Sequence, residues 1–288
     1  MKKAYGEKLN VKNNSFQLVG SKDFFNERLK IEDFQGDIGK VADLIEKLQM
    51  EEYVKKTIVK SRKENLLHFI KLGYALEAVL PNYYSGSEVY FLCKYQDQSR
   101  YLSDKWLKED LIMEEVRLKK RTTRQHLPSS LRLRKATISD ANNLASFYAN
   151  VFPIYPVPIE DPNYIKDQIL GDSIFHLIEE EGNIIAAASA EVNRRYGNAE
   201  ITDCATLPTY RKGGYMYYLI ESLEKELSEN QVFCCYSIAR ALSFGMNMVL
   251  HNLAYSYTGR LKNNCYIFDK IEDMNVWFKD LSNPAAEK

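Results

Sequence analysis

The loop at residues 206–216, TLPTYRKGGYM, has the residue types best suited to chemistry in this chain. It lies between an expected strand and an expected amphipathic helix, so several backbone N–H groups point to one place at the positive end of that helix. Gly213 and Gly214 let a ligand approach the main chain closely, and Arg211 and Lys212 add positive charge beside it. These features predict a pyrophosphate-binding loop. An ordinary strand-to-helix turn with two glycines is the alternative.

Two acidic residues, Glu200 and Asp203, lie on the expected strand that leads into this loop. Either carboxylate could act as a general base toward an alkyl ammonium, which has a pKa of about 10.4 and must lose a proton before it can act as a nucleophile. Because their spacing is odd, we expect the two side chains to point to opposite faces of the strand, so that at most one lines the site directly. Asp203, the nearer to the loop, is the first choice and Glu200 the second. A solvated or ion-paired residue is the alternative for both.

The second half of the chain alternates strands and helices in a regular order. Helices are indicated by apolar residues at helical spacing, and strands by alternation or by short apolar runs. The expected strands are residues 131–137, 173–179, 184–192, 199–207, 232–238 and two more from about 255 onward, and the expected helices are residues 141–151, 163–170, 216–227 and 242–253. This order, β-α-α-β-β-β-α-β-α-β-β, predicts an α/β fold with a mixed central sheet and helices on both faces.

The first half is expected to be a smaller α/β domain. Its expected helices are residues 38–48, 62–72 and 103–118, and its expected strands are residues 53–60, 74–80 and 88–94. The run from 53 to 94 parallels the run from 232 to 279, which indicates a degenerate half-copy of the second-half fold without a second Arg-x-x-Gly loop. Coincidence between two common α/β patterns is the alternative.

Composition places the chain among packed globular proteins, since 45% of its 288 residues are hydrophobic and 27% are charged. Lys plus Arg and Asp plus Glu number 39 each, which gives no bulk electrostatic reason to bind nucleic acid or an anionic membrane. Residues 117–135 carry eight Lys and Arg and no acid. An exposed linker is the favoured interpretation and a nucleic-acid arm the alternative. We expect domains at residues 1–125 and 130–282, with the boundary near Pro128.

The five cysteines are scattered and form no Cys-x-x-Cys pair, so the sequence predicts neither a zinc site nor a disulfide framework. Cys234 and Cys235 lie in an apolar run and are expected to be core thiols, with a nucleophilic role as the alternative. The first residues are polar and include no apolar stretch of signal-peptide or membrane length. We therefore expect a cytoplasmic protein without a membrane partner.

The loop and the order of elements together resemble the acetyltransferases of the GNAT family. In that family the pyrophosphate of acetyl-CoA binds to Arg/Gln-x-x-Gly-x-Gly/Ala, after a strand that ends in x-Pro. Here Arg211 and Gly214 match the motif, while Met216 stands where Gly or Ala is usual. The stretches 239–247, 263–265 and 272–279 further resemble the β-lysine N-acetyltransferases, in which a domain of similar size also precedes the GNAT domain.

The resemblance implies transfer of acetyl from acetyl-CoA, without a metal, to the terminal amine of β-lysine, which gives a neutral compatible solute. It implies that a backbone N–H near Ala205 polarises the acetyl carbonyl. The implied cofactor-binding residues are Ala205, Leu207, Arg211, Lys212, Gly213, Gly214, Tyr215 and Met216. The alternatives are another small amine, a protein lysine, or an acyl-CoA-binding module without turnover. The oligomeric state is left open.

The tyrosine that often protonates the departing thiolate in this family is missing, because its position falls on Leu250. His251, next to it, is a substitute, and Tyr255 and Tyr257 on the following strand are alternatives. The residues expected to anchor the acceptor are Asn247, Asn263 and Asn264 for its carboxylate and Glu272 for an ammonium. Turn and capping roles are the alternative for these side chains.

Overall fold

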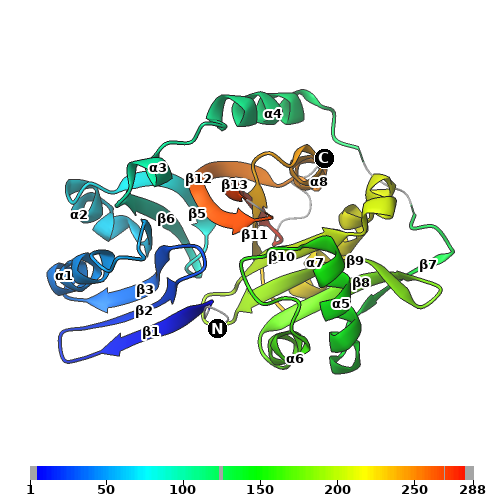
Figure 1. The fold of residues 1–288 in the computed structure, drawn as a ribbon, viewed down its shortest axis with the longest axis horizontal. Coiled ribbons are helices and arrows are strands. Elements are labelled where there is room, and N and C mark those ends of the chain that lie inside the picture. The colour runs from blue at the N-terminus through cyan, green and yellow to red at the C-terminus, as the bar shows by residue number, and fades with distance from the viewer. Residues whose placement is uncertain (1–4, 123–125, 269, 283–288) are drawn as a thin grey trace.

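The strands of both halves join edge to edge in one sheet. In the computed structural model, which describes residues 5–122, 126–268 and 270–282, thirteen strands follow one another in the order β1-β2-β3-β4-β6-β5-β12-β13-β11-β10-β9-β8-β7. Figure 1 shows β1–β6 on one side, β7–β10 on the other and the long strands β12 and β13 between them. We call β1–β6 with their helices the N-terminal half, and β7–β13 with theirs the C-terminal half.

The C-terminal half has the predicted order of elements, so the predicted fold class is confirmed. Its strands are β7 (Leu131–Lys135), β8 (Ser173–Glu180), β9 (Asn183–Asn193), β10 (Asn198–Thr206), β11 (Cys234–Arg240), β12 (Ser256–Ile267) and β13 (Lys270–Asp280). Its helices are α5 (Ala141–Val151), α6 (Pro162–Leu170), α7 (Tyr215–Glu229) and α8 (Phe244–Asn252). Strands β10 and β11 pair in parallel, while β9 with β10 and β11 with β13 pair antiparallel, which makes the sheet mixed.

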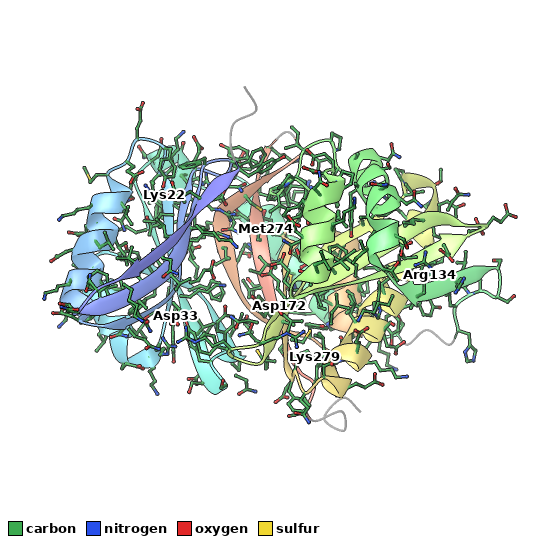
Figure 2. The ribbon with its side chains drawn as sticks, turned by 90° about the horizontal axis from the view of Figure 1, so that it is seen from below. Lys22, Asp33, Arg134, Asp172, Met274 and Lys279 are labelled. Atoms are coloured by element: carbon green, nitrogen blue, oxygen red, sulfur yellow. The ribbon has the colours of Figure 1, made fainter. Side chains whose placement is uncertain are left out.

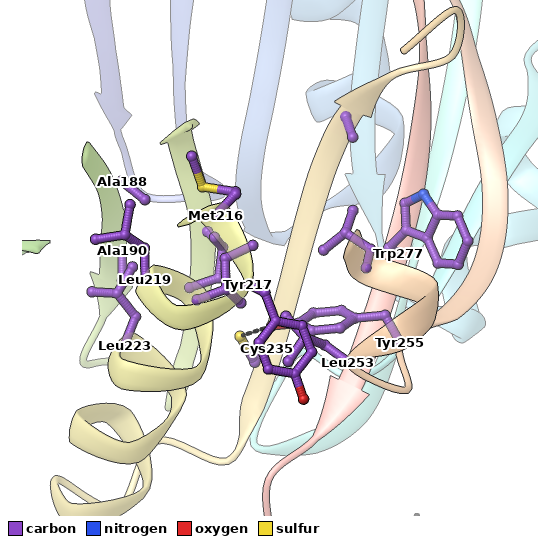
Figure 3. Close-up of a cluster of buried hydrophobic side chains, with 14 of the residues drawn as sticks. Ala188, Ala190, Met216, Tyr217, Leu219, Leu223, Cys235, Leu253, Tyr255 and Trp277 are labelled. Carbon is purple, nitrogen blue, oxygen red and sulfur yellow. Dashed lines mark hydrogen bonds between the residues drawn. The ribbon is translucent and has the colours of Figure 1, made fainter. Parts of the chain in front are cut away.

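Helices cover both faces of the sheet in this half. Successive side chains of β9 point to opposite faces, and apolar side chains occur on both. Ala186, Ala188 and Ala190 belong to the apolar cluster around α7, whereas Ala187 belongs to the cluster around α5 and α6. All four are fully buried. In Figure 3, Leu219 of α7 lies close to Ala188 and Ala190. Small side chains on both faces of β9 thus let the two helical layers approach the sheet closely.

The N-terminal half contains three strands that the sequence pattern did not predict. These are β1 (Gly6–Lys12), β2 (Phe16–Asp23) and β3 (Arg28–Gly36). The remaining elements are α1 (Ile38–Gln49), β4 (Lys56–Ser61), α2 (Leu66–Lys71), β5 (Ala75–Asn82), β6 (Gly86–Tyr95), α3 (Gln98–Tyr101) and α4 (Trp106–Leu118). Strand β1 is at the sheet edge and mostly exposed, and β3 alternates charged and apolar residues only from Arg28 to Glu32, after which Asp33 ends the pattern.

The two halves have the same strand topology. In the N-terminal half the order is β1-β2-β3-β4-β6-β5, and in the C-terminal half the order β8-β9-β10-β11-β13-β12 repeats it, with the parallel pair at the same place. The helix between the parallel strands is α1 in one half and α7 in the other. The repeat is therefore more extensive than the half-copy that the sequence suggested, since β1–β3 match β8–β10. The expected boundary between residues 125 and 130 stays a prediction.

The two halves meet where β5 pairs with β12, the equivalent strands of the repeat. Gly259 lies opposite Ala78 in this antiparallel contact. Its φ is +153°, and a Cβ built on it would lie 2.2 Å from the Glu77 carbonyl oxygen. Beside this contact, the buried Lys56 ammonium pairs with Glu77 at 3.0 Å and donates to the Lys262 carbonyl at 2.6 Å. The junction thus depends on a close backbone approach and on one buried ion pair.

The basic segment that follows α4 contacts α8. His251 Nε2 lies 3.0 Å from the Lys119 carbonyl oxygen, and the Thr122 N–H donates to Asn252 Oδ1 at 3.1 Å. Residues 123–125 of the expected linker lie outside the described residues. Among the helices of the described ranges, none has the length and apolar character needed to cross a membrane.

We expect Gly259→Ala to lower the free energy of unfolding by about 2 kcal/mol or more, because positive-φ strain and an overpacked contact add at the junction. Denaturant unfolding followed by tryptophan fluorescence measures this. Gly39→Ala in α1 is the matched control, because a Cβ there has room and alanine favours a helix, so stability should be unchanged or higher. A Gly259→Ala protein as stable as the wild type would contradict the requirement for close approach.

Candidate active site

A cavity of about 590 Å³ opens where β10 and β11 stop pairing. The two strands are in parallel register only from Asn198–Ile201 against Cys234–Ser237. At the end of this register, Ser237 Oγ donates to the Ile201 carbonyl at 2.9 Å. Residues beyond that point on both strands line this first cavity. Because the two strands separate here, a ligand can reach main-chain N–H and C=O groups that would be paired with each other in a continuous ladder.

The glycine-containing loop borders the first cavity. Gly214 has φ +68° and immediately precedes α7, so the chain enters the helix through a left-handed residue. Arg211 and Lys212 are exposed and line the cavity, and neither side chain forms a hydrogen bond or ion pair with another described residue. Uncommitted cations beside a helix N-terminus fit a phosphate group.

The other predicted members of this site divide into two groups. Ala205, Tyr215 and Met216 line the first cavity, and Met216 is nearly buried among the apolar residues around α7. Leu207 and Gly213 belong to the same loop but do not line the cavity. Leu207 instead packs its side chain against the apolar clusters on both sides of the sheet.

Asp203 lies at a β-bulge of β10. The register with β9 shifts between Thr202 and Ala205, and Asp203 has φ +51°. The extra residue interrupts the alternation of side chains. As a result Glu200 and Asp203 line the same cavity, and the expectation that their odd spacing separates them is wrong. The bulge is the physical reason.

Two hydroxyl groups hold the Asp203 carboxylate. Tyr155 Oη donates to Oδ1 at 3.0 Å and Ser189 Oγ donates to Oδ2 at 2.6 Å. Burial raises the pKa of Asp203, and the two hydrogen bonds oppose this shift. The carboxylate is therefore fixed in position and is more basic than a solvated aspartate.

A second cavity, of about 390 Å³, lies between the two halves. Strands β3 and β4 contribute Arg28, Lys30, Glu32 and Lys60 to its wall, and the C-terminal half contributes Glu191, Glu200 and Asp203. The residues that line both cavities are Tyr155, Thr202, Asp203, Ile238, Ile267 and Met274. Figure 2 labels Met274 between the two halves. The two cavities thus meet at Asp203.

The two walls of the second cavity differ in their charged groups: cations paired with Glu32 lie on one wall, and three carboxyl groups lie on the other. On β3 and β4, Lys60 pairs with Glu32 at 2.5 Å and donates to Tyr83 Oη at 3.0 Å. Burial raises the pKa of Glu32, but the ammonium groups of Lys60 and Lys30 outweigh it and lower the pKa to about 2.

On the opposite wall the carboxyl groups have few cations near them. Glu191 contacts the solvent in the cavity, but the surrounding protein and the carboxylates of Glu200 and Asp203 raise its pKa to about 8. Burial also raises the pKa of Glu200, against the effect of Lys60 and Lys30. A cationic ligand that settles among these three acids would favour their ionised forms.

Three of the predicted acceptor anchors are engaged elsewhere. Asn247 donates to the Ser243 carbonyl at 2.8 Å and accepts from Trp277 Nε1 at 3.0 Å, and Asn263 donates to the Arg100 carbonyl at 2.9 Å. Glu272 pairs with Arg240 at 2.8 Å. None of the three lines either cavity, whereas Asn264 lines the second. The structure therefore brings only Asn264 of this group to the acceptor side.

The residues considered for thiolate protonation also lie away from the cavities. His251 contacts the Lys119 carbonyl, and Tyr257 lies outside both cavities. Tyr255 is buried with its hydroxyl 3.1 Å from Cys235 Sγ, the contact drawn as a dashed line in Figure 3. Cys234 and Cys235 are both buried, as expected of core thiols.

Sequence reasoning missed Tyr155 and the whole wall from β3 and β4. Tyr155 lies in the proline-containing loop between α5 and α6, where no periodic pattern relates it to Asp203. The charged residues of β3 recur at every second position, Arg28, Lys30 and Glu32. This recurrence at every second position is the feature of the sequence that could have predicted a strand with one polar face.

Known proteins match this chain along nearly all of its length. The pattern of the acetyltransferase (GNAT) family matches residues 142–242. The N-acetyltransferase YodP of Bacillus subtilis is 36% identical over 94% of this chain and 98% of that protein. Two proteins named beta-lysine N(6)-acetyltransferase are 35% identical over 86% of this chain and 100% of the Methanosarcina mazei protein, and 33% identical over 88% of this chain and 93% of the Methanococcus maripaludis protein.

In the structure, a glycine-containing loop with two exposed cations and a buried carboxylate border the place where the parallel strands β10 and β11 separate. The chain belongs to the GNAT family and is an acetyl-CoA-dependent N-acetyltransferase.

Proposed function

We propose that this enzyme transfers acetyl from acetyl-CoA to the terminal amine of β-lysine, and that the product serves as a compatible solute. The single observation that carries the proposal is the position of Asp203, whose side chain lines both the cavity beside the loop and the cavity between the halves. A base at that point can serve an amine that arrives from one cavity and a thioester held in the other. The names of two relatives support β-lysine as the acceptor.

Acetyl-CoA supplies the activated acetyl group as a thioester. Arg211, Lys212 and the N-terminus of α7 would hold its pyrophosphate. The main chain of β10 near Ala205, freed from β11, would donate to the acetyl oxygen as negative charge develops there.

Asp203 is the proposed general base. The acceptor arrives as an ammonium, which Glu191, Glu200 and Asp203 attract. Transfer of its proton to Asp203 leaves a neutral amine, whose nitrogen forms the new N–C bond as the C–S bond breaks. Glu200 is the second choice for this role, since it lines the same cavity.

Tyr155 is the proposed acid for the departing sulfur. Burial and the Asp203 carboxylate both raise the pKa of Tyr155. When Asp203 accepts the amine proton its charge disappears, so the pKa of Tyr155 falls as the sulfur needs a proton. The phenol proton goes to sulfur, and the proton on Asp203 then replaces it through their hydrogen bond. Asp203, ionised again, accepts the second proton of the acetylated nitrogen and releases it to solvent, so that the product is a neutral amide.

We expect Asp203→Asn to lower kcat/KM for the amine by about 100-fold near pH 7, the typical contribution of a general base. Activity should recover partly as the pH approaches about 10.4, because the free amine then needs no base. Thiol release measured from pH 6.5 to 10 tests this. Asp172→Asn is the matched control, because Asp172 pairs with Arg194 on the surface. A loss that does not vary with pH would move the role to Glu200 or to water.

Tyr155→Phe should lower kcat by about tenfold or more while the affinity for acetyl-CoA, measured by calorimetry, stays unchanged. Since Tyr155 and Asp203 act as one unit, adding Tyr155→Phe to Asp203→Asn should cost little more than Asp203→Asn alone. Tyr164→Phe on α6 is the control, because Tyr164 lines neither cavity. Fully additive losses in the double variant would contradict a shared proton path.

The acceptor can be tested with amines that lack one group. We expect β-lysine to exceed cadaverine by about 100-fold in kcat/KM, because a site built to pair a carboxylate leaves polar groups unpaired when it is absent. Lysine, with its α-amine one carbon displaced, should fall between the two. Equal values for β-lysine and cadaverine would make a polyamine the better candidate.

A further inference from the structure

We propose that the N-terminal half recognises the carboxylate of the acceptor, and that Lys30 is its principal contact. This inference rests on the proposed function, in which the acceptor is a diamino acid. In this proposal the N-terminal half, which has no Arg-x-x-Gly loop, selects the substrate.

The repeat places oppositely charged residues at equivalent positions. The parallel register starts at Arg28 in β3 and at Asn198 in β10, so Lys30 and Glu200 both lie two residues further along. Both side chains line the second cavity. The two copies thus differ in charge at this equivalent position, with the Lys30 ammonium on one side of the cavity and the Glu200 carboxylate on the other.

Among the cations of this wall, Lys30 is the least committed. Arg28 donates two hydrogen bonds to Asp23, at 2.6 and 3.1 Å. Lys60 donates to Glu32 and Tyr83. The Lys30 ammonium lies 3.9 Å from the Glu32 carboxylate and forms no hydrogen bond with a side chain or carbonyl of the other described residues. An ammonium has three donors, so that of Lys30 can bind a ligand carboxylate without breaking an existing hydrogen bond.

The second cavity has charged groups for both ends of a diamino acid. The reactive amine has to reach Asp203, which marks the meeting point of the cavities. Its carboxylate, at the other end of the molecule, then extends toward β3, while Glu191, Glu200 and Glu32 remain for the second ammonium. Enclosure strengthens each of these pairings relative to water. A diamine without a carboxylate would leave Lys30 unpaired.

Lys30→Met in the full-length enzyme tests the proposal. We expect kcat/KM for β-lysine to fall about 30-fold or more, the scale of a lost charge-assisted hydrogen bond, while kcat/KM for cadaverine changes by less than about threefold. Lys30→Arg should retain most of the β-lysine activity. Lys22→Met on β2 is the matched control, because Lys22 pairs with Glu51 and lines neither cavity.

The outcomes separate this inference from the proposed function. If the wild type does not prefer β-lysine to cadaverine, the proposed function fails before any variant is compared. If the wild type does prefer it and Lys30→Met keeps that preference, only the role of Lys30 is overturned. Equal losses on both amines would also overturn the role of Lys30, because they would indicate a general effect on the site. An acetyl-CoA affinity that calorimetry finds unchanged would show that the variant is folded.

Discussion

The β-bulge at Asp203 is the constraint on which the rest of the site depends. One extra residue on β10 shifts its register with β9, which resumes at Ala205, and turns Asp203 away from the face that alternation would give it. Just before this point the parallel pairing with β11 ends, and the first cavity occupies the space between those two strands. The bulge and the separation of the parallel strands together leave an opening beside β10 and place a carboxylate at the boundary between two cavities.

The repeated topology explains how a single sheet can serve two ligands. Each half has one parallel pair flanked by antiparallel strands, and the halves join through β5 and β12. Only the C-terminal copy has the Arg-x-x-Gly loop. The N-terminal copy instead has charged side chains on β3 and β4 that face the space shared with β10. The repeat thus gives two similar surfaces that differ in sequence, and the proposed division of labour assigns the cofactor to one and the acceptor to the other.

The sequence predicted the fold of the C-terminal half well because its helices have apolar stripes and its strands are short apolar runs. The loop from Arg211 to Met216 could be singled out because it places glycines and cations before a helix, and its role in phosphate binding stays a prediction. Strand β3 alternates charged and apolar residues only from Arg28 to Glu32, and this spacing does not reveal that the charged face borders a cavity. Tyr155 and the shared orientation of Glu200 and Asp203 depend on loop packing and on a bulge, and neither follows from spacing.

The contact between Ala78 and Gly259 has a consequence for how the protein folds. These residues are about 180 positions apart in the chain, and the loop between them includes most of the C-terminal half. Closing so long a loop costs conformational entropy, which is offset only by contacts between the folded surfaces of the two halves. We therefore expect this pairing to form late. The second cavity, whose walls come from both sides of this contact, is then completed after the loop at residues 206–216 and the helix that follows it, both of which depend on contacts within one half.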